Sequence, residues 1–337
     1  MKEVIEAREL FILDGPGAIV RGTHHKTCDE SFNSPSNQIG RDRVGLVFLA
    51  GLSATRALNG DVAVYWADSF AERGYPSFRL DLPGSGDSEG DPPAEWLNFI
   101  NRGGYASIAS DKIKELVARF NLSGVVIVGH CSGTVSAIFT AATASRECQG
   151  LVLMDPYFQL RQIGRPKIRA QLSIWAIQSR LGGLLSNLFD RLKGIHMFLR
   201  GSVLPENANL PLLRCWKEVA STGLPILILK APGLKTQGVK PRVGQFDYFR
   251  YILRSAGRRS QVVVRPVDGA NHSFANRLGR TAVRQHIEDW LNACFPLTKC
   301  EEGAVSTLRS ECDDNKSHHP TSPELPARIV VAVETKN

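Results

Sequence analysis

Short apolar runs alternate with stretches of helical periodicity along most of the chain, and this alternation constrains the fold more than any other feature. The runs occupy residues 44–50, 76–81, 125–129, 151–155, 225–230 and 261–267. The amphipathic stretches occupy residues 61–74, 105–120, 132–146 and 281–295. Strands that alternate with helices predict βαβ units and a mostly parallel sheet. Two β-rich runs at 9–13 and 17–23, joined by Asp-Gly-Pro-Gly, predict an antiparallel pair of strands before it.

One long segment interrupts the alternation. About 70 residues separate the fourth run from the fifth, far more than the few residues usual for a connection in a compact domain. We predict a helical cap inserted at residues 157–222, between the two parts of one core at 1–156 and 223–295. Residues 296–337 are polar and predict a disordered tail.

A tight turn follows the run at 125–129, where Gly129-His-Cys-Ser-Gly133 leads directly into a helical stretch. Side chains at the two glycine positions would clash in such a turn, so glycine there leaves Cys131 exposed above the sheet. The following helix directs its first N–H groups and its positive dipole end toward Cys131, which favours the thiolate. The sequence therefore predicts a nucleophile at Cys131, with an inert buried thiol as the alternative.

Together with this turn, the segment Asp81-Leu-Pro-Gly-Ser-Gly-Asp-Ser88 resembles the D-x-x-G-x-G-x-S turn of the α/β-hydrolase superfamily. The resemblance covers residues 9–295. Within the superfamily, the sequence is similar to serine-aminopeptidase-like and exosortase-associated hydrolases, with Cys131 in place of their nucleophilic serine. It implies an eight-stranded, mostly parallel α/β-hydrolase sheet with helices on both faces and an inserted helical cap.

The resemblance also implies a catalytic histidine and an acid. His272 follows the last apolar run, where the superfamily places its general base. The acid departs from the pattern, because the segment after the run at 225–230 contains no Asp or Glu in Lys-Ala-Pro-Gly-Leu-Lys-Thr-Gln-Gly. Two candidates stay open: Asp155, at the end of the run at 151–155, which we prefer, and Asp247.

Two backbone N–H groups are expected to form the oxyanion hole. One belongs to Ser132, directly after the nucleophile. The other is that of Leu52, in the loop after the run at 44–50, where the superfamily often has a His-Gly pair and this chain keeps only Gly51.

Composition and charge limit the partners. The chain is 43% hydrophobic and 22% charged, with a net charge of +8, values that exclude wholesale disorder, collagen and coiled coil. Residues 157–222 hold ten Lys and Arg residues against three acidic ones, so this basic cap suits an anionic or carrier-bound substrate, peripheral contact with an anionic membrane, or no more than a solvated cover. No recognised nucleic-acid module accompanies the charge, so no nucleic-acid partner is predicted.

Location and cofactors follow from what the sequence lacks. No run approaches the roughly 18 apolar residues that a membrane-spanning helix needs, and acidic residues stand near the start, so we expect a cytoplasmic protein. The seven cysteines form no C-x-x-C pair. We predict neither a metal nor another cofactor.

These observations favour an esterase, thioesterase or acyltransferase that forms a covalent acyl-enzyme on Cys131, with His272 as base and Asp155 as the acid that orients it. The competing hypothesis is a catalytically inactive binding or scaffold protein of the same fold, because the serine, the usual acid and the His-Gly pair are all replaced.

Overall fold

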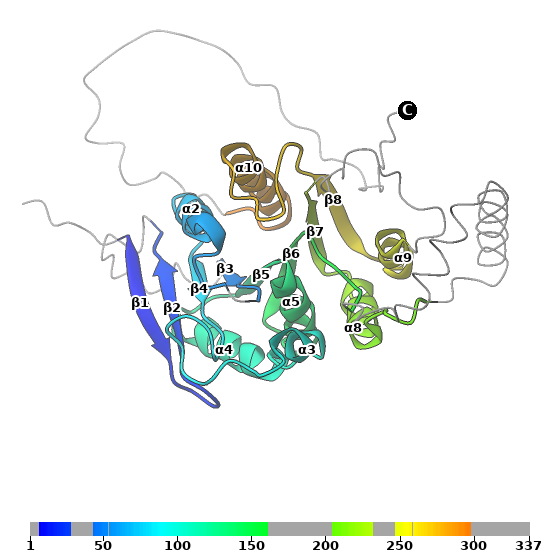
Figure 1. Cartoon of the computed structure of the whole chain (residues 1–337). Coiled ribbons are helices and arrows are strands. Elements are labelled where there is room, and N and C mark those ends of the chain that lie inside the picture. The colour runs from blue at the N-terminus through cyan, green and yellow to red at the C-terminus, as the bar shows by residue number, and fades with distance from the viewer. Residues whose placement is uncertain are drawn as a thin grey trace, which may run out of the picture.

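Eight strands form one sheet in the computed structural model, which describes residues 7–27, 43–52, 54–160, 204–231, 247–257 and 259–297. The strand order is β1-β2-β4-β3-β5-β6-β7-β8 (Figure 1). The strands are β1 (Arg8–Leu13), β2 (Val20–His25), β3 (Val44–Leu49), β4 (Ser77–Leu80), β5 (Gly124–His130), β6 (Cys148–Met154), β7 (Pro225–Lys230) and β8 (Gln261–Pro266). The sequence prediction of eight strands, led by an antiparallel pair, is confirmed.

The strand order contains a switch point at β3. Strands β3 to β8 are parallel, and β2 runs antiparallel to both β1 and β4. β3 lies between β4 and β5, so the chain turns to opposite sides of β3 in successive connections. In open parallel sheets, ligands bind at the carboxyl ends of the strands on either side of such a switch. The ends of β3 and β5 are therefore where a functional site is expected.

Helices cover both faces of this sheet (Figure 1). One face carries α2 (Val62–Ala71) and α10 (Arg277–Cys294), and the other carries α3 (Trp96–Asn101), α4 (Ala106–Arg119), α5 (Ser132–Thr143), α8 (Leu210–Ser221) and α9 (Tyr248–Ser255). A short 3₁₀ helix, η1 (Asn59–Asp61), precedes α2.

Successive residues of a strand point to opposite faces of the sheet, so alternate residues contribute to two separate hydrophobic cores, one on each face. In β3, Val47 and Leu49 pack with α4 and α5, whereas Leu46 and Phe48 pack with α2 and α10. A sheet buried on both faces explains why the strands read as continuous apolar runs, and it fixes the strand ends rigidly in place.

Most of the predicted cap lies outside the described residues, because 161–203 is not among them. Residues 204–222 of the predicted cap are described and hold α8, which packs against α5. Its Leu212 and Trp216 are fully buried. The tail from 298 onward also lies outside the described residues. No helix in the described part of the chain is long and apolar enough to cross a membrane.

Candidate active site

Cys131 lies at the sharp turn between β5 and α5. Its backbone has φ 53° and ψ −120°, a combination that non-glycine residues adopt only at a cost on the order of 1–3 kcal/mol. A Cβ on Gly129 would lie 2.5 Å from the Gly133 carbonyl oxygen, and a Cβ on Gly133 would lie 2.5 Å from that of Leu49. Both glycines are thus required by close backbone approach, and they hold Cys131 in a strained, partly exposed position.

Burial sets the charge state of Cys131. Burial raises the pKa of the Cys131 thiol, and the nearby charge of Asp155 raises it further. Hydrogen bonds from the backbone and the hydroxyl of Ser132 act in the opposite direction but do not outweigh burial. The sequence-based expectation of a resting thiolate is therefore wrong, because burial is the largest influence on the Cys131 pKa and raises it.

His272 and Asp155 are brought together from two different strand ends. His272 Nδ1 donates a hydrogen bond of 2.6 Å to Asp155 Oδ2. Asp155 follows β6, the neighbour of β5, and has a positive φ of 52°. With Nδ1 carrying the donated proton, Nε2 of a neutral His272 is left as the basic ring nitrogen. Within the described part of the chain, the Cys131 thiol makes no hydrogen bond to His272.

Asp155 also has a neighbour of opposite charge. Lys230, at the end of β7, places Nζ 3.6 Å from Asp155 Oδ1. The Asp155 side chain is 20% exposed and its backbone N–H donates to the Leu229 carbonyl, so the carboxylate is anchored at a fixed strand end.

Asp247, the alternative acid, caps a helix and does not contact His272 in the described part of the chain. It is the N-cap of α9, where its carboxylate accepts a hydrogen bond of 2.9 Å from the backbone N–H of Arg250. The structure therefore pairs His272 with Asp155 and leaves Asp247 at a helix end.

His130 is a site residue that the sequence analysis missed. It is 7% exposed, and its Nε2 donates a hydrogen bond of 2.7 Å to the backbone carbonyl of His272. Burial lowers the pKa of His130, so the ring is neutral. The two imidazoles lie 5.4 Å apart between ring centroids. The sequence signal was a histidine directly before Cys131 in Gly-His-Cys-Ser-Gly, but the hydrogen-bond partner of that histidine, 142 residues away, can be identified only from the fold.

The loop after β3 contacts the elbow, as we call the turn at residues 129–133 between β5 and α5. The Leu52 N–H donates a hydrogen bond of 2.5 Å to Ser132 Oγ. A Cβ on Gly51 would lie 2.8 Å from the same oxygen and 3.0 Å from the His130 carbonyl, so only glycine allows this approach. The two predicted oxyanion residues, Leu52 and Ser132, are thus adjacent, and the Leu52 N–H already has a partner in the Ser132 hydroxyl.

Comparisons with known proteins agree with this architecture. A family model described as alpha/beta hydrolase fold matches residues 46–177. The chain resembles the structure of DcsB in complex with its substrate analogue, with 16% identity, 85% of this chain and 100% of that chain covered, and a TM-score of 0.50. No curated protein sequence matches the chain.

Two further solved structures are similar at lower scores. A thioesterase domain from the curacin biosynthetic pathway has 14% identity, covers 84% of this chain and 99% of its own, and has a TM-score of 0.48. An alpha-beta serine hydrolase homologue from Coxiella burnetii has 13% identity, with 83% and 95% covered and a TM-score of 0.46. The superfamily resemblance drawn from the sequence is confirmed, whereas the closer likeness to serine-aminopeptidase-like and exosortase-associated hydrolases stays a prediction.

Proposed function

We propose that this chain, a member of the α/β-hydrolase superfamily, is an enzyme that takes an acyl group from a small ester or thioester onto Cys131. His272 acts as the general base, and Asp155 orients it. The observation that carries the proposal is the 2.6 Å hydrogen bond from His272 Nδ1 to Asp155 beside the strained turn at Cys131. A pair of this kind, next to a partly exposed thiol on a sharp strand-to-helix turn, is the arrangement that acyl transfer needs.

The reaction begins with a neutral thiol, since burial raises the pKa of Cys131. As the Cys131 sulfur attacks the acyl carbon, the thiol proton moves to Nε2 of His272. Asp155 then faces an imidazolium and stabilises its charge. Because Cys131 and His272 are not hydrogen-bonded to each other, the exposed His272 ring approaches the sulfur as substrate binds; its side chain is 56% exposed.

The negative charge that forms on the acyl oxygen needs donors. The Ser132 N–H is at the start of α5, and the Leu52 N–H is directed at the same elbow. In the proposed mechanism the acyl oxygen shares the Leu52 donor with the Ser132 hydroxyl. Removing one such donor from an oxyanion hole typically costs on the order of 10²-fold to 10³-fold in rate.

The intermediate collapses when the bond to the leaving group breaks and His272 returns its proton to the departing alkoxide or thiolate. This leaves an acyl thioester on Cys131. Water or a second nucleophile then attacks it and gives a proton to His272. The bond between the acyl carbon and sulfur breaks, His272 returns the proton to the sulfur, and the acyl product and the free thiol are released. A thioester intermediate is close in energy to a thioester substrate, so hydrolysis of thioesters and acyl transfer are both within reach of this site.

The basic segment at 157–222 suggests an anionic or carrier-bound acyl donor, with peripheral membrane contact as the second use of its charge. A cytoplasmic location fits such a substrate. These parts of the proposal rest on charge alone and require no nucleic acid or cofactor.

Turnover of a panel of acyl esters and acyl thioesters tests the proposal. Wild type should turn over at least one substrate class, and both Cys131→Ala and His272→Ala should lose that activity. Turnover that survives Cys131→Ala would refute the nucleophile. Absence of turnover in the wild type, with no acyl-enzyme, would favour the binding or scaffold protein.

A further inference from the structure

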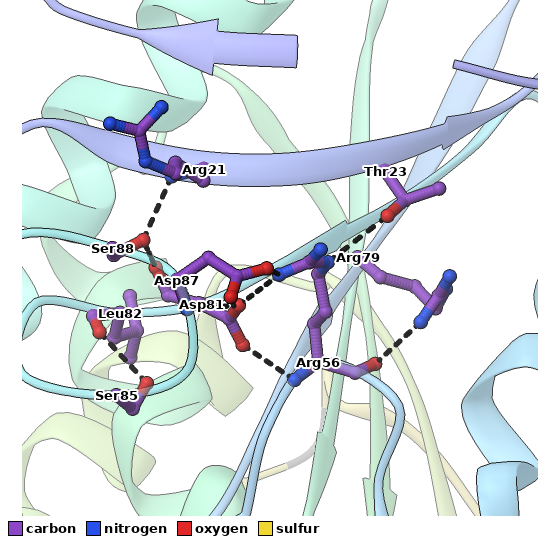
Figure 2. Close-up of polar contacts among 9 residues, drawn as sticks. All are labelled: Arg21, Thr23, Arg56, Arg79, Asp81, Leu82, Ser85, Asp87 and Ser88. Atoms are coloured by element: carbon purple, nitrogen blue, oxygen red, sulfur yellow. Dashed lines mark hydrogen bonds and ion pairs between the residues drawn. The ribbon is translucent and has the colours of Figure 1, made fainter. Parts of the chain in front are cut away.

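A partly buried cluster of charged residues surrounds Arg56 in the loop after β3, outside the proposed catalytic groups (Figure 2). Arg56 Nη1 forms ion pairs with Asp81, at the end of β4, and with Asp87 Oδ2 at 2.7 Å. The Asp81 side chain is fully buried and that of Arg56 is 17% exposed. Burial alone would lower the pKa of Arg56, but Asp87 and Asp81 outweigh it and raise the pKa.

The backbone of Arg56 is held as well as its side chain. Its N–H donates a hydrogen bond of 2.6 Å to Asp81 Oδ1, and its carbonyl accepts one of 3.2 Å from Arg79. Arg56 Nε donates to Thr23 Oγ1 at 3.0 Å. Groups from β2, β4 and the turn after β4 therefore fix this one residue, as Figure 2 shows.

The turn after β4 is folded around the Asp81 carboxylate. The Asp87 N–H donates to Asp81 Oδ2 at 3.1 Å. A Cβ on Gly86 would overlap that carboxylate, and Gly86 has a positive φ of 52°. In this D-x-x-G-x-G-x-S turn, Asp81 therefore presents its carboxylate to Arg56, and Gly86 leaves the room that the carboxylate needs.

The cluster continues away from the site through alternating charges. Arg79 Nε donates to His25 Nε2 at 2.7 Å, and His25 Nδ1 donates to Asp68 at 2.7 Å. Arg8 pairs with Asp68 through two hydrogen bonds. Burial and the charge of Arg56 lower the pKa of Arg79 to about 10, yet it remains a cation at neutral pH. The three arginines of the cluster balance its three aspartates, and we call this network of ion pairs the anchor.

The loop that begins with Gly51 is therefore held at two places. At one, the Leu52 N–H and Gly51 contact the elbow. At the other, four residues later, Arg56 is fixed to Asp81. We infer that Arg56 and Asp81 are positioning residues, which hold the loop so that the Leu52 N–H stays at the Ser132 hydroxyl, where it can also donate to the acyl oxygen bound to Cys131. This inference rests on the proposed function.

Weakening this anchor should slow the acylation of Cys131 but not its alkylation. Attack on an acyl carbon places negative charge on an oxygen next to the Leu52 N–H. Alkylation of Cys131 by iodoacetamide displaces iodide from a saturated carbon and forms no such oxyanion. The first reaction therefore depends on the loop position, and the second depends on the thiol alone.

The test compares both rates in Arg56→Gln. Acylation of Cys131 by an activated acyl ester should fall on the order of 10-fold to 100-fold, below the full loss of a donor, because the elbow still holds the loop. Alkylation by iodoacetamide should stay within about twofold of the wild type. Arg56→Lys, which keeps the charge but not the planar fork of donors, should recover part of the acylation rate.

Arg21→Gln is the matched control. Arg21 lies on β2 beside the same turn, and its guanidinium makes an exposed ion pair of 3.8 Å with Glu89 but does not contact Arg56 or Asp81. This variant should keep the wild-type rate in both reactions.

Unchanged acylation in Arg56→Gln, or an equal fall in both rates, would overturn the inference. If Arg56→Gln does not fold, Arg56→Lys and Asp87→Asn decide by the same two rates, since Asp87 is 66% exposed and supplies only one of the two ion pairs.

If the wild type forms no acyl-enzyme, the proposed function fails by itself. Amide hydrogen exchange at Leu52 then tests the anchor: faster exchange in Arg56→Gln supports it, and unchanged exchange refutes it.

Discussion

Acidification should destabilise the fold through His25, a fully buried histidine of the Arg56 cluster. Its Nε2 accepts a hydrogen bond from Arg79, and its Nδ1 donates to Asp68, so both ring nitrogens are used by the neutral form. Burial lowers the pKa of His25 from its ordinary value of 6.5 to about 4, against the opposing hydrogen bond with Asp68. Protonation would place a cation next to Arg79 and remove the acceptor of its hydrogen bond.

The magnitude follows from the two pKa values. Between pH 6.5 and about 4, the unfolded chain binds a proton at His25 that the folded chain does not. The free energy of unfolding therefore falls as the pH decreases through this window. A difference of 2.5 pKa units corresponds to about 3 kcal/mol once the pH is below both values, and to about 2 kcal/mol between pH 7 and pH 4.5.

Urea unfolding at pH 7 and pH 4.5 checks this, with His25→Gln as the comparison. Glutamine can also accept from Arg79 and donate to Asp68 but does not titrate. The wild type should lose about 2 kcal/mol more than His25→Gln over this interval, because other titrating groups contribute equally to both proteins. Equal losses in the two proteins would refute the reasoning.

Three further predictions concern the site. Asp155→Asn should lower kcat on the order of 10²-fold to 10⁴-fold because it removes the charge that orients His272, whereas Asp247→Asn should leave kcat unchanged, since Asn caps a helix equally well; steady-state turnover of both variants decides. The rate of alkylation of Cys131 should rise with pH to a midpoint above about 8.5, because burial raises the thiol pKa, and a midpoint well below that value would contradict the charge state described. Gly133→Ala should lower the free energy of unfolding on the order of 1–3 kcal/mol, because its Cβ would meet the Leu49 carbonyl; denaturant unfolding that matches the wild type would show that the turn has room.

Features that depend on local periodicity could be predicted from the sequence. The apolar runs became strands because a sheet covered on both faces buries every residue of a strand such as β3. The turn at Cys131 was predictable for a similar reason, since the two glycines that it requires, Gly129 and Gly133, stand in the local sequence.

Features that depend on which strand ends meet could not be predicted in this way. His272 pairs with Asp155 and not with Asp247 because the ends of β6 and β8 meet in the fold, and no local pattern encodes that meeting. The pKa of Cys131 was predicted with the wrong sign, because the sequence shows the helix start but not the depth of burial. The position of Arg56 could not be predicted either, because its partners, such as Thr23 and Asp81, come from separate segments of the chain.

The most direct test of the proposed enzyme is the intact mass of the protein after brief exposure to activated acyl esters and acyl thioesters. Wild type and Cys131→Ala are quenched in acid within seconds and compared. The proposed mechanism predicts a mass increase equal to one acyl group in the wild type and none in Cys131→Ala. An acyl adduct that persists in Cys131→Ala, or no adduct in the wild type with any donor, would contradict it.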